Sequence, residues 1–68
     1  MDILRQVGEN LRRLRRLHDL SQEAVALEAE VARSYMSALE RGKRNPTLQL
    51  LERLAWALDT TVIDLISP

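Results

Sequence analysis

The chain of 68 residues lacks cysteine and phenylalanine, and its only large aromatic residues are one tyrosine, Tyr35, and one tryptophan, Trp56. The absence of cysteine excludes disulfides and thiolate metal sites and suits a reducing compartment, so we expect a cytoplasmic protein. Scarce aromatic residues supply strands poorly, whereas the abundant leucine, alanine, arginine and glutamate favour helices. The composition therefore predicts an all-α fold.

No apolar run resembles a signal peptide or a membrane span, because charged residues interrupt the longest apolar windows every few positions. A composition of 46% hydrophobic and 29% charged residues describes a soluble globular protein. A chain of 68 residues is expected to form one domain, 1–68. Such a domain buries only about 60% of its unfolded surface, so we expect a small stability margin and support from a partner chain.

The residues that enzymes use are also missing. The chain has one histidine, no cysteine and no glycine-rich phosphate loop. No histidine or carboxylate pair has the spacing of metal ligands on a shared helical face. We therefore expect neither an enzyme nor a metal or other cofactor, and no small-molecule ligand is indicated.

The formal net charge is zero, although a nucleic-acid-binding protein usually shows an excess of basic residues. The charges are unevenly distributed, however. Residues 33–44 contain four basic side chains and Glu40 as the only acidic one, whereas acidic residues predominate from Thr47 onward. This asymmetry can orient a protein on a polyanion, and it predicts weaker non-specific binding than a uniformly basic domain would have.

Apolar residues recur every three or four positions, which is the spacing of amphipathic helices. Helices are predicted at about 2–18, from Gln22 to the turn at Glu30, and at 33–41, 48–58 and 62–66. Ser21, Thr47 and either Thr60 or Thr61 are suitable N-caps, whereas Ala32 gives the third helix no side-chain cap. In the fourth helix the inward stripe is expected to contain Leu48, Leu51, Leu54, Ala55 and Leu58.

The segment 22–41 reads as two short helices joined by a turn. Val25, Ala26 and Ala29 share one helical face, and the methyl group of Ala26 lets two helices cross closely. With Val31, Met36 and Leu39 this pattern resembles the helix-turn-helix of the Cro and phage-repressor (XRE-type) family. The stretches 20–23, 33–42 and 44–48 extend the resemblance over nearly the whole chain. They are similar to those of restriction-modification controller proteins, although phage-type repressors and antitoxins share them.

The chain departs from the family's pattern at three positions. Asp19 and Glu30 stand where the family has glycine, and Ala32 stands where it has a capping residue, whereas Gly42 keeps the family's glycine. We expect the left-handed conformation at Asp19, Glu30 and Gly42, with Glu30 strained by about 1 kcal/mol. The missing cap at Ala32 should cost about 1 kcal/mol more.

The resemblance implies a five-helix, lambda-repressor-like domain that regulates transcription as a homodimer on a pseudo-palindromic operator in double-stranded DNA. The recognition helix, about 33–41, would enter the major groove. By the same resemblance, the residues that contact DNA would be Gln22, Arg33, Ser34, Tyr35, Ser37, Ala38, Lys43, Arg44 and Asn45. The family also places a structural ion pair at Arg15 and Glu40.

Two of these residues leave alternatives open. The Arg33 guanidinium can donate two bonds to guanine, worth about 1 to 3 kcal/mol of discrimination, or it can contact a phosphate. Tyr35 can pack at the rim with its hydroxyl near the DNA backbone, or it can simply pack. Because Ala38 offers only a methyl group, DNA shape and a dimer's doubled contacts would need to supply specificity.

Trp56, Ile63 and Ile66 fall on outward positions of the last two helices, as does Leu50 in this reading. A cluster of exposed large apolar residues is typical of an interaction surface. We expect these residues to form the interface of a two-fold dimer, and the alternative is that Trp56 folds back onto its own chain.

Two other functions are open. A protein-interaction module, antitoxin-like for example, would bind a partner protein through Trp56 and the last helix and bind DNA weakly. Membrane association through the first helix would require its apolar stripe to be exposed. A folded core would contradict the membrane reading, so we expect no membrane partner.

Overall fold

The computed structural model describes residues 2–68, and these residues form five α-helices and no strand. The helices are α1 (Ile3–Leu17), α2 (Gln22–Glu28), α3 (Arg33–Glu40), α4 (Leu48–Ala57) and α5 (Val62–Ile66). The predicted all-α fold is confirmed, and each helix ends within a residue or two of its predicted bounds.

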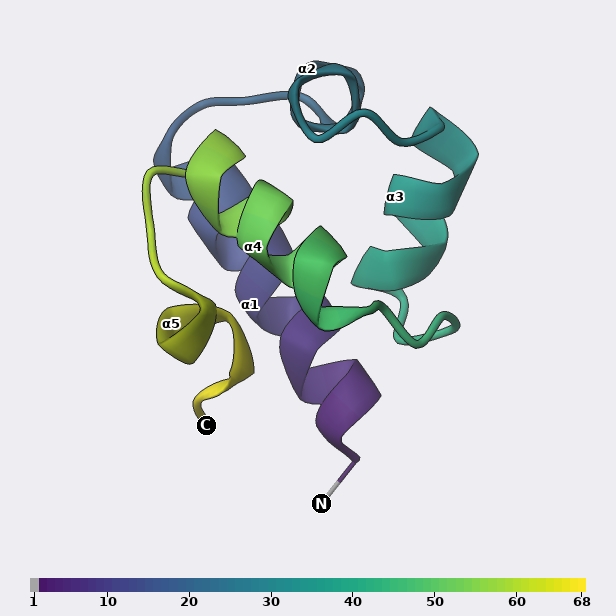
Figure 1. The fold of residues 1–68 in the computed structure, drawn as a ribbon, viewed down its shortest axis with the longest axis vertical. Coiled ribbons are helices and arrows are strands. Elements are labelled where there is room, and N and C mark those ends of the chain that lie inside the picture. The colour runs from purple at the N-terminus through teal and green to yellow at the C-terminus, as the bar shows by residue number, and fades with distance from the viewer. Residues whose placement is uncertain (1) are drawn as a thin grey trace.

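In Figure 1, α4 lies in front of the long helix α1, and both helices run from the lower right to the upper left. α3 and α5 lie on opposite sides of this pair, while α2 lies across one end. α1 packs against both α3 and α5, α2 packs against α3 and α4, and α4 packs against α5. α1 therefore connects the side of the molecule that carries α3 to the side that carries α5.

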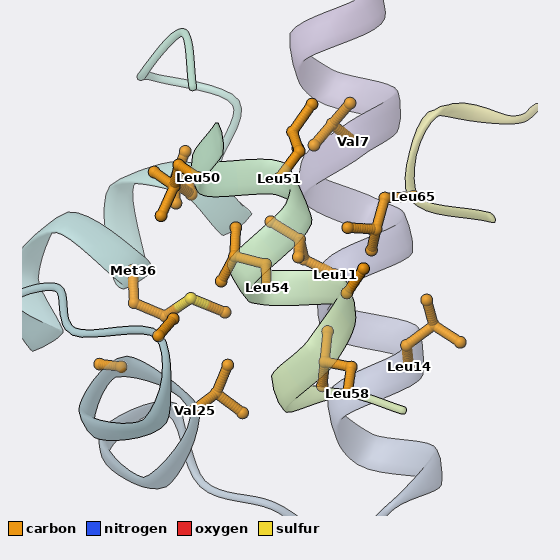
Figure 2. Packing of buried hydrophobic residues seen from close by; sticks show 14 residues of the cluster. Val7, Leu11, Leu14, Val25, Met36, Leu50, Leu51, Leu54, Leu58 and Leu65 are labelled. Atoms are coloured by element: carbon orange, nitrogen blue, oxygen red, sulfur yellow. The ribbon is translucent and has the colours of Figure 1, made fainter. Parts of the chain in front are cut away.

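The hydrophobic core forms where these helices meet, and every helix contributes to it (Figure 2). Its fully buried side chains include Leu11 from α1, Met36 and Leu39 from α3, Leu54 from α4 and Leu65 from α5. Burying one such side chain contributes about 1.5 to 3 kcal/mol. The stripe of α1 that a membrane would need, which includes Val7, Leu11 and Leu14, lies in this core, so the membrane reading is wrong.

The inward face of α4 differs from the prediction at its first turn. Leu48, predicted to be buried, is 76% exposed, and Leu50, predicted to face outward, is only 5% exposed. Leu50, Leu54 and Leu58 are four residues apart and form one row on the helix, which faces the core. Leu48 stands beside that row at the start of the helix, where no neighbouring element covers it.

The N-caps follow the predicted chemistry. Ser21 accepts a hydrogen bond from the Ala24 amide at 3.0 Å, and Thr47 accepts one from the Leu50 amide at 3.1 Å. Thr61, rather than Thr60, caps α5 by accepting from the Asp64 amide at 3.2 Å. As predicted, Ala32 provides no side-chain hydrogen bond at the start of α3.

Helices α1 to α4 all end in a Schellman motif, in which a left-handed residue turns the chain and the next amide donates to a carbonyl five residues back. The left-handed residues are Asp19 (φ 55°), Glu30 (φ 60°), Gly42 (φ 71°) and Asp59 (φ 51°). The left-handed conformation of Asp59 was not predicted. A left-handed conformation costs a non-glycine residue roughly 1 kcal/mol, and an acidic side chain is also unfavourable at the negative end of a helix.

Candidate nucleic-acid interface

The candidate interface begins on the outer face of α3. Arg33 and Ser34 are exposed at the start of the helix, and Ser37 and Ala38 are half-buried along it. Met36 and Leu39 anchor the opposite face in the core. The outer face is therefore narrow and polar, with one cationic side chain at its N-terminal end.

Arg33 has no ionic partner within residues 2–68, where the ion pairs are Arg5 with Glu9 and the two arginine pairs of Glu40. It is an exposed side chain whose five N–H donors are not engaged by a carboxylate of the described chain. The start of α3 thus presents an available cation beside two serine hydroxyls.

A basic loop follows α3 and is fixed to it by the Schellman motif. The Gly42 amide donates to the Leu39 carbonyl at 3.0 Å, and the Lys43 amide donates to the Ala38 carbonyl at 2.9 Å. A Cβ at Gly42 would lie 3.0 Å from the Arg5 Cα, so the loop passes close to the backbone of α1. Lys43, Arg44 and Asn45 are exposed in this loop.

Tyr35 connects this loop to α3. The Arg44 guanidinium lies 4.7 Å from the centroid of the Tyr35 ring, within the range of a cation–π interaction. The ring is half-buried and packs against the core. Arg44 is thereby held beside the outer face of α3, where it adds a second positive charge.

The other end of α3 is held by its last residue, Glu40, whose side chain is fully buried. Arg15 donates to it twice, from Nε to Oε2 at 2.6 Å and from Nη2 to Oε1 at 3.0 Å. Arg12 and Gln22 also donate to Oε1, at 3.4 Å and 3.1 Å. Arg15 further donates to the Leu20 carbonyl at 3.0 Å, so the network joins α1, the start of α2 and the end of α3.

Gln22, which the family resemblance places at a phosphate or a base, also takes part in the Glu40 network. It is half-buried, and one N–H of its amide donates to Glu40. The paired Arg15 leaves Oε1 of Glu40 able to accept more bonds, and Gln22 at the start of α2 lies within reach of it. One N–H and the amide oxygen of Gln22 remain for other contacts.

The ionisation of the network follows from its geometry. Burial alone raises the pKa of Glu40, but the hydrogen bonds from Arg15 and Gln22, the Arg15 charge and the bond from Arg12 together outweigh burial and lower it. The hydrogen bond to Glu40 raises the pKa of Arg15 against the effect of its own burial. Both groups are therefore charged at neutral pH.

Gly8 brings α1 into backbone contact with the end of α3. A Cβ at this position would lie 2.6 Å from the carbonyl oxygens of both Leu39 and Glu40, which is closer than any real contact. Sequence reasoning missed this residue. The available signal was a glycine in the middle of a predicted helix, because glycine there costs about 1 kcal/mol unless packing needs it.

The residues predicted for a dimer interface lie away from this network. Trp56 on α4 is 82% exposed and Ile63 on α5 is 71% exposed, and Ile66 is exposed as well. The alternative in which Trp56 folds back onto its own chain is therefore wrong. Trp56 instead lines a shallow pocket of about 500 Å³ with Glu28, Glu30, Glu52 and Arg53.

Among residues 2–68, histidine and carboxylate side chains form no group of three or more that could hold a metal ion. No helix in the same part of the chain has the length and apolar character needed to cross a membrane.

The sequence and the fold both have known counterparts. A family model described as helix-turn-helix matches residues 11–65. The chain is 44% identical over 68 residues to the uncharacterized HTH-type transcriptional regulator y4dJ of Sinorhizobium fredii, covering 100% of this chain and 88% of that protein. It is 42% identical over 67 residues to control protein C.SmaI of Serratia marcescens, covering 98% of this chain and 80% of that one.

Solved structures of related proteins have the same fold. The restriction-modification controller protein C.AhdI of Aeromonas hydrophila superposes with a TM-score of 0.88 at 42% identity, covering 91% of this chain and 94% of that one. The N-terminal DNA binding domain of SinR from Bacillus subtilis gives a TM-score of 0.86 at 32% identity, covering 94% of each chain.

Proposed function

We propose that the chain, which belongs to the helix-turn-helix family of DNA-binding transcriptional regulators, acts in the cytoplasm as a homodimer on a pseudo-palindromic operator. Members of this family are not enzymes. The observation that carries the proposal is the available cation Arg33 on a narrow polar face, directly beside a basic loop.

In this proposal α3 enters the major groove, which is about 12 Å wide and admits an α-helix. Arg33, Ser34, Ser37 and Ala38 would face base edges, because their neighbours Met36 and Leu39 are committed to the core. Lys43, Arg44 and Asn45 would contact the phosphate backbone, with Arg44 steadied by Tyr35. Gln22 would contribute its remaining N–H group to a phosphate next to the start of α2.

A single copy would read few base pairs, because α3 has only eight residues and its outer face is short. Two copies would double the contacts, with their recognition helices about 34 Å apart, one turn of DNA. The surface available for pairing contains Trp56, Ile63 and Ile66 on α4 and α5. Covering these side chains removes large apolar area from water, which is the main driving force for association.

The proposal is tested by selecting sites from a pool of random duplex DNA across a salt series. We expect a two-fold symmetric site to be enriched. The logarithm of the affinity should fall against the logarithm of salt concentration with a slope of about 0.9 for each phosphate contact. Absence of any enriched site, with weak binding lost at physiological salt, would rule the regulator out.

Two variants of Arg33 separate base contact from phosphate contact. With a base contact, Arg33→Ala and Arg33→Lys both relax one position in each half-site, because lysine keeps the charge but loses the bidentate fork. With a phosphate contact, Arg33→Ala lowers the salt slope by about 0.9 per half-site and lowers the affinity for all sequences alike. Arg33→Lys then keeps the wild-type salt slope and affinity.

A second candidate is the protein-interaction module. It is favoured by the zero net charge and by the exposed Trp56 in a pocket lined by three glutamates. In that case Trp56→Ala would abolish partner binding, while the DNA selection would yield no symmetric site.

A further inference from the structure

Asn10 is a buried polar residue, only 3% exposed, and it has no part in the proposed DNA contacts. Its Nδ2 donates to the carbonyl oxygens of Leu65 at 2.9 Å and Ser67 at 2.7 Å. Its Oδ1 accepts from Gln6 Nε2 at 3.1 Å and Arg13 Nη2 at 3.5 Å. Both donors and both acceptor positions of the amide are therefore occupied.

The two carbonyls that Asn10 holds lie at the C-terminal end of α5. This helix has five residues, fewer than an isolated helix needs to persist in water. Its final carbonyl groups have no partner within the helix and must find one elsewhere. The fully buried Leu65 anchors the inner face of α5, and Asn10 satisfies the exit of the helix.

Asn10 and the network at Glu40 connect α1 to opposite sides of the molecule. On one side, Gly8 and Arg15 hold the end of α3. On the opposite side (Figure 1), Asn10 holds the end of α5, and this helix carries the exposed Ile63 and Ile66. α1 thus separates the two helices, and α3 and α5 are each tied to it by buried or partly buried polar bonds.

We propose that Asn10 is the positioning residue of the dimer surface. It fixes α5 relative to α3, and in the dimer it thereby sets the distance between the two recognition helices. This inference rests on the proposed homodimer and adds the residue that determines its geometry.

The chemistry requires an amide at this position. A leucine of similar size has no donor, so it would leave one buried and one partly buried carbonyl without its partner. An aspartate would place a carboxylate, which only accepts, against both carbonyl oxygens. Alanine would remove the donors and open a cavity between α1 and the end of α5.

The test compares the wild-type chain, Asn10→Ala and Asn10→Ser, with Val25→Ala as the control. Val25 is buried in α2 away from α5, so its loss destabilises the fold without touching the α1–α5 contact. Sedimentation equilibrium measures the dimer dissociation constant. We expect it to rise on the order of tenfold in Asn10→Ala and less in Asn10→Ser, which keeps one donor, and to stay unchanged in Val25→Ala.

Two readouts separate positioning from general stability. Amide hydrogen exchange should accelerate at Leu65 and Ser67 in Asn10→Ala, while the amides of α3 keep their protection. On operators whose half-sites are moved apart or together by one base pair, the wild type should discriminate strongly and Asn10→Ala should discriminate less. If Asn10→Ala does not fold, the same comparisons apply to Asn10→Ser.

The outcomes are distinct for the two proposals. A wild-type chain that remains monomeric at all concentrations, on and off DNA, would overturn the homodimer and this inference with it. The inference alone would be overturned if the wild type is a dimer and both Asn10 variants keep its dissociation constant and its discrimination between half-site spacings. So would equal weakening of the dimer by Val25→Ala.

Discussion

At its C-terminal end α3 is tied to α1 by the Glu40 network and by backbone contact at Gly8, whereas its N-terminal end follows the strained Glu30 and the uncapped Ala32. The C-terminal end, which fixes the helix in place, is buried and fully hydrogen-bonded. The end that carries Arg33 and Ser34 is exposed and lacks a side-chain cap, and it follows a glutamate held in the left-handed conformation.

This contrast shows how an eight-residue helix can be oriented without being stabilised along its whole length. The orientation comes from contacts at one end, which are polar, buried and specific in geometry. The N-terminal end is left exposed, where a binding partner can contact it. Substitutions that weaken the anchored end, and one that strengthens the free end, test this difference.

The largest effect is expected for Glu40→Ala. This change leaves Arg15, which is only 13% exposed, without its ionic partner, and breaking a buried pair costs about 3 to 5 kcal/mol. Urea unfolding followed by circular dichroism at pH 7 measures the loss. The control is Glu52→Ala on the exposed face of α4, which should change stability by less than about 0.5 kcal/mol. A loss below about 1 kcal/mol for Glu40→Ala would show that the network does not anchor α3.

Gly8→Ala should be next. Helix propensity alone would make alanine stabilising by about 1 kcal/mol, but its Cβ would overlap two carbonyl oxygens at 2.6 Å. We expect a net destabilisation of about 1 to 3 kcal/mol, measured by urea unfolding, with reduced operator affinity because α3 must shift. Glu9→Ala, at the exposed neighbouring position, is the control. A more stable Gly8→Ala variant would mean that the two backbones can separate freely.

Stability should also depend on pH through Glu40. Its pKa is lowered in the folded state, so the unfolded chain binds the proton more tightly. The stabilisation is complete above the ordinary glutamate pKa of about 4.3 and is lost as pH falls from there toward the lowered folded value. Unfolding midpoints from pH 7 to pH 3 should fall more steeply in the wild type than in Glu40→Gln, which is less stable at neutral pH. Parallel curves would contradict the assigned pKa direction.

The smallest effect is expected at the other end of α3. Ala32→Ser supplies the missing cap and should stabilise the fold by about 1 kcal/mol in the same unfolding assay. The control Ala24→Ser places the same change inside α2, where it should cost a few tenths of a kcal/mol. If Ala32→Ser gains nothing, the first amides of α3 are already satisfied by water.

The features that the sequence predicted well are local. Helix positions follow from apolar spacing, and the caps at Ser21 and Thr47 and the left-handed Gly42 follow from chemistry within a few residues. The left-handed Glu30 was expected only because the family has glycine at that position. The exchange of Leu48 and Leu50 shows the limit of this approach. Both fit an apolar stripe, and only the position of neighbouring helices decides which one is covered.

The contacts that position the candidate site join residues far apart in the sequence. Asn10 bonds to Leu65, and Gly8 contacts Glu40, so neither could be inferred before the helices were placed. Arg15 and Glu40 were expected only through resemblance to a family, and their additional partners Arg12 and Gln22 were not. Spacing along α1 puts Arg12 near Arg15, but it does not show that Glu40 lies opposite both.

The absence of aromatic side chains from the core has a spectroscopic consequence. The chain's one tryptophan is 82% exposed on α4, and its one tyrosine lies under Arg44 beside the basic loop. Ultraviolet fluorescence therefore reports little about the core. A blue shift of Trp56 emission would signal that a second chain covers α4, and a change in Tyr35 emission would signal an event at the loop. Two optical probes already present in the natural chain thus allow assembly and DNA binding to be followed separately in one sample.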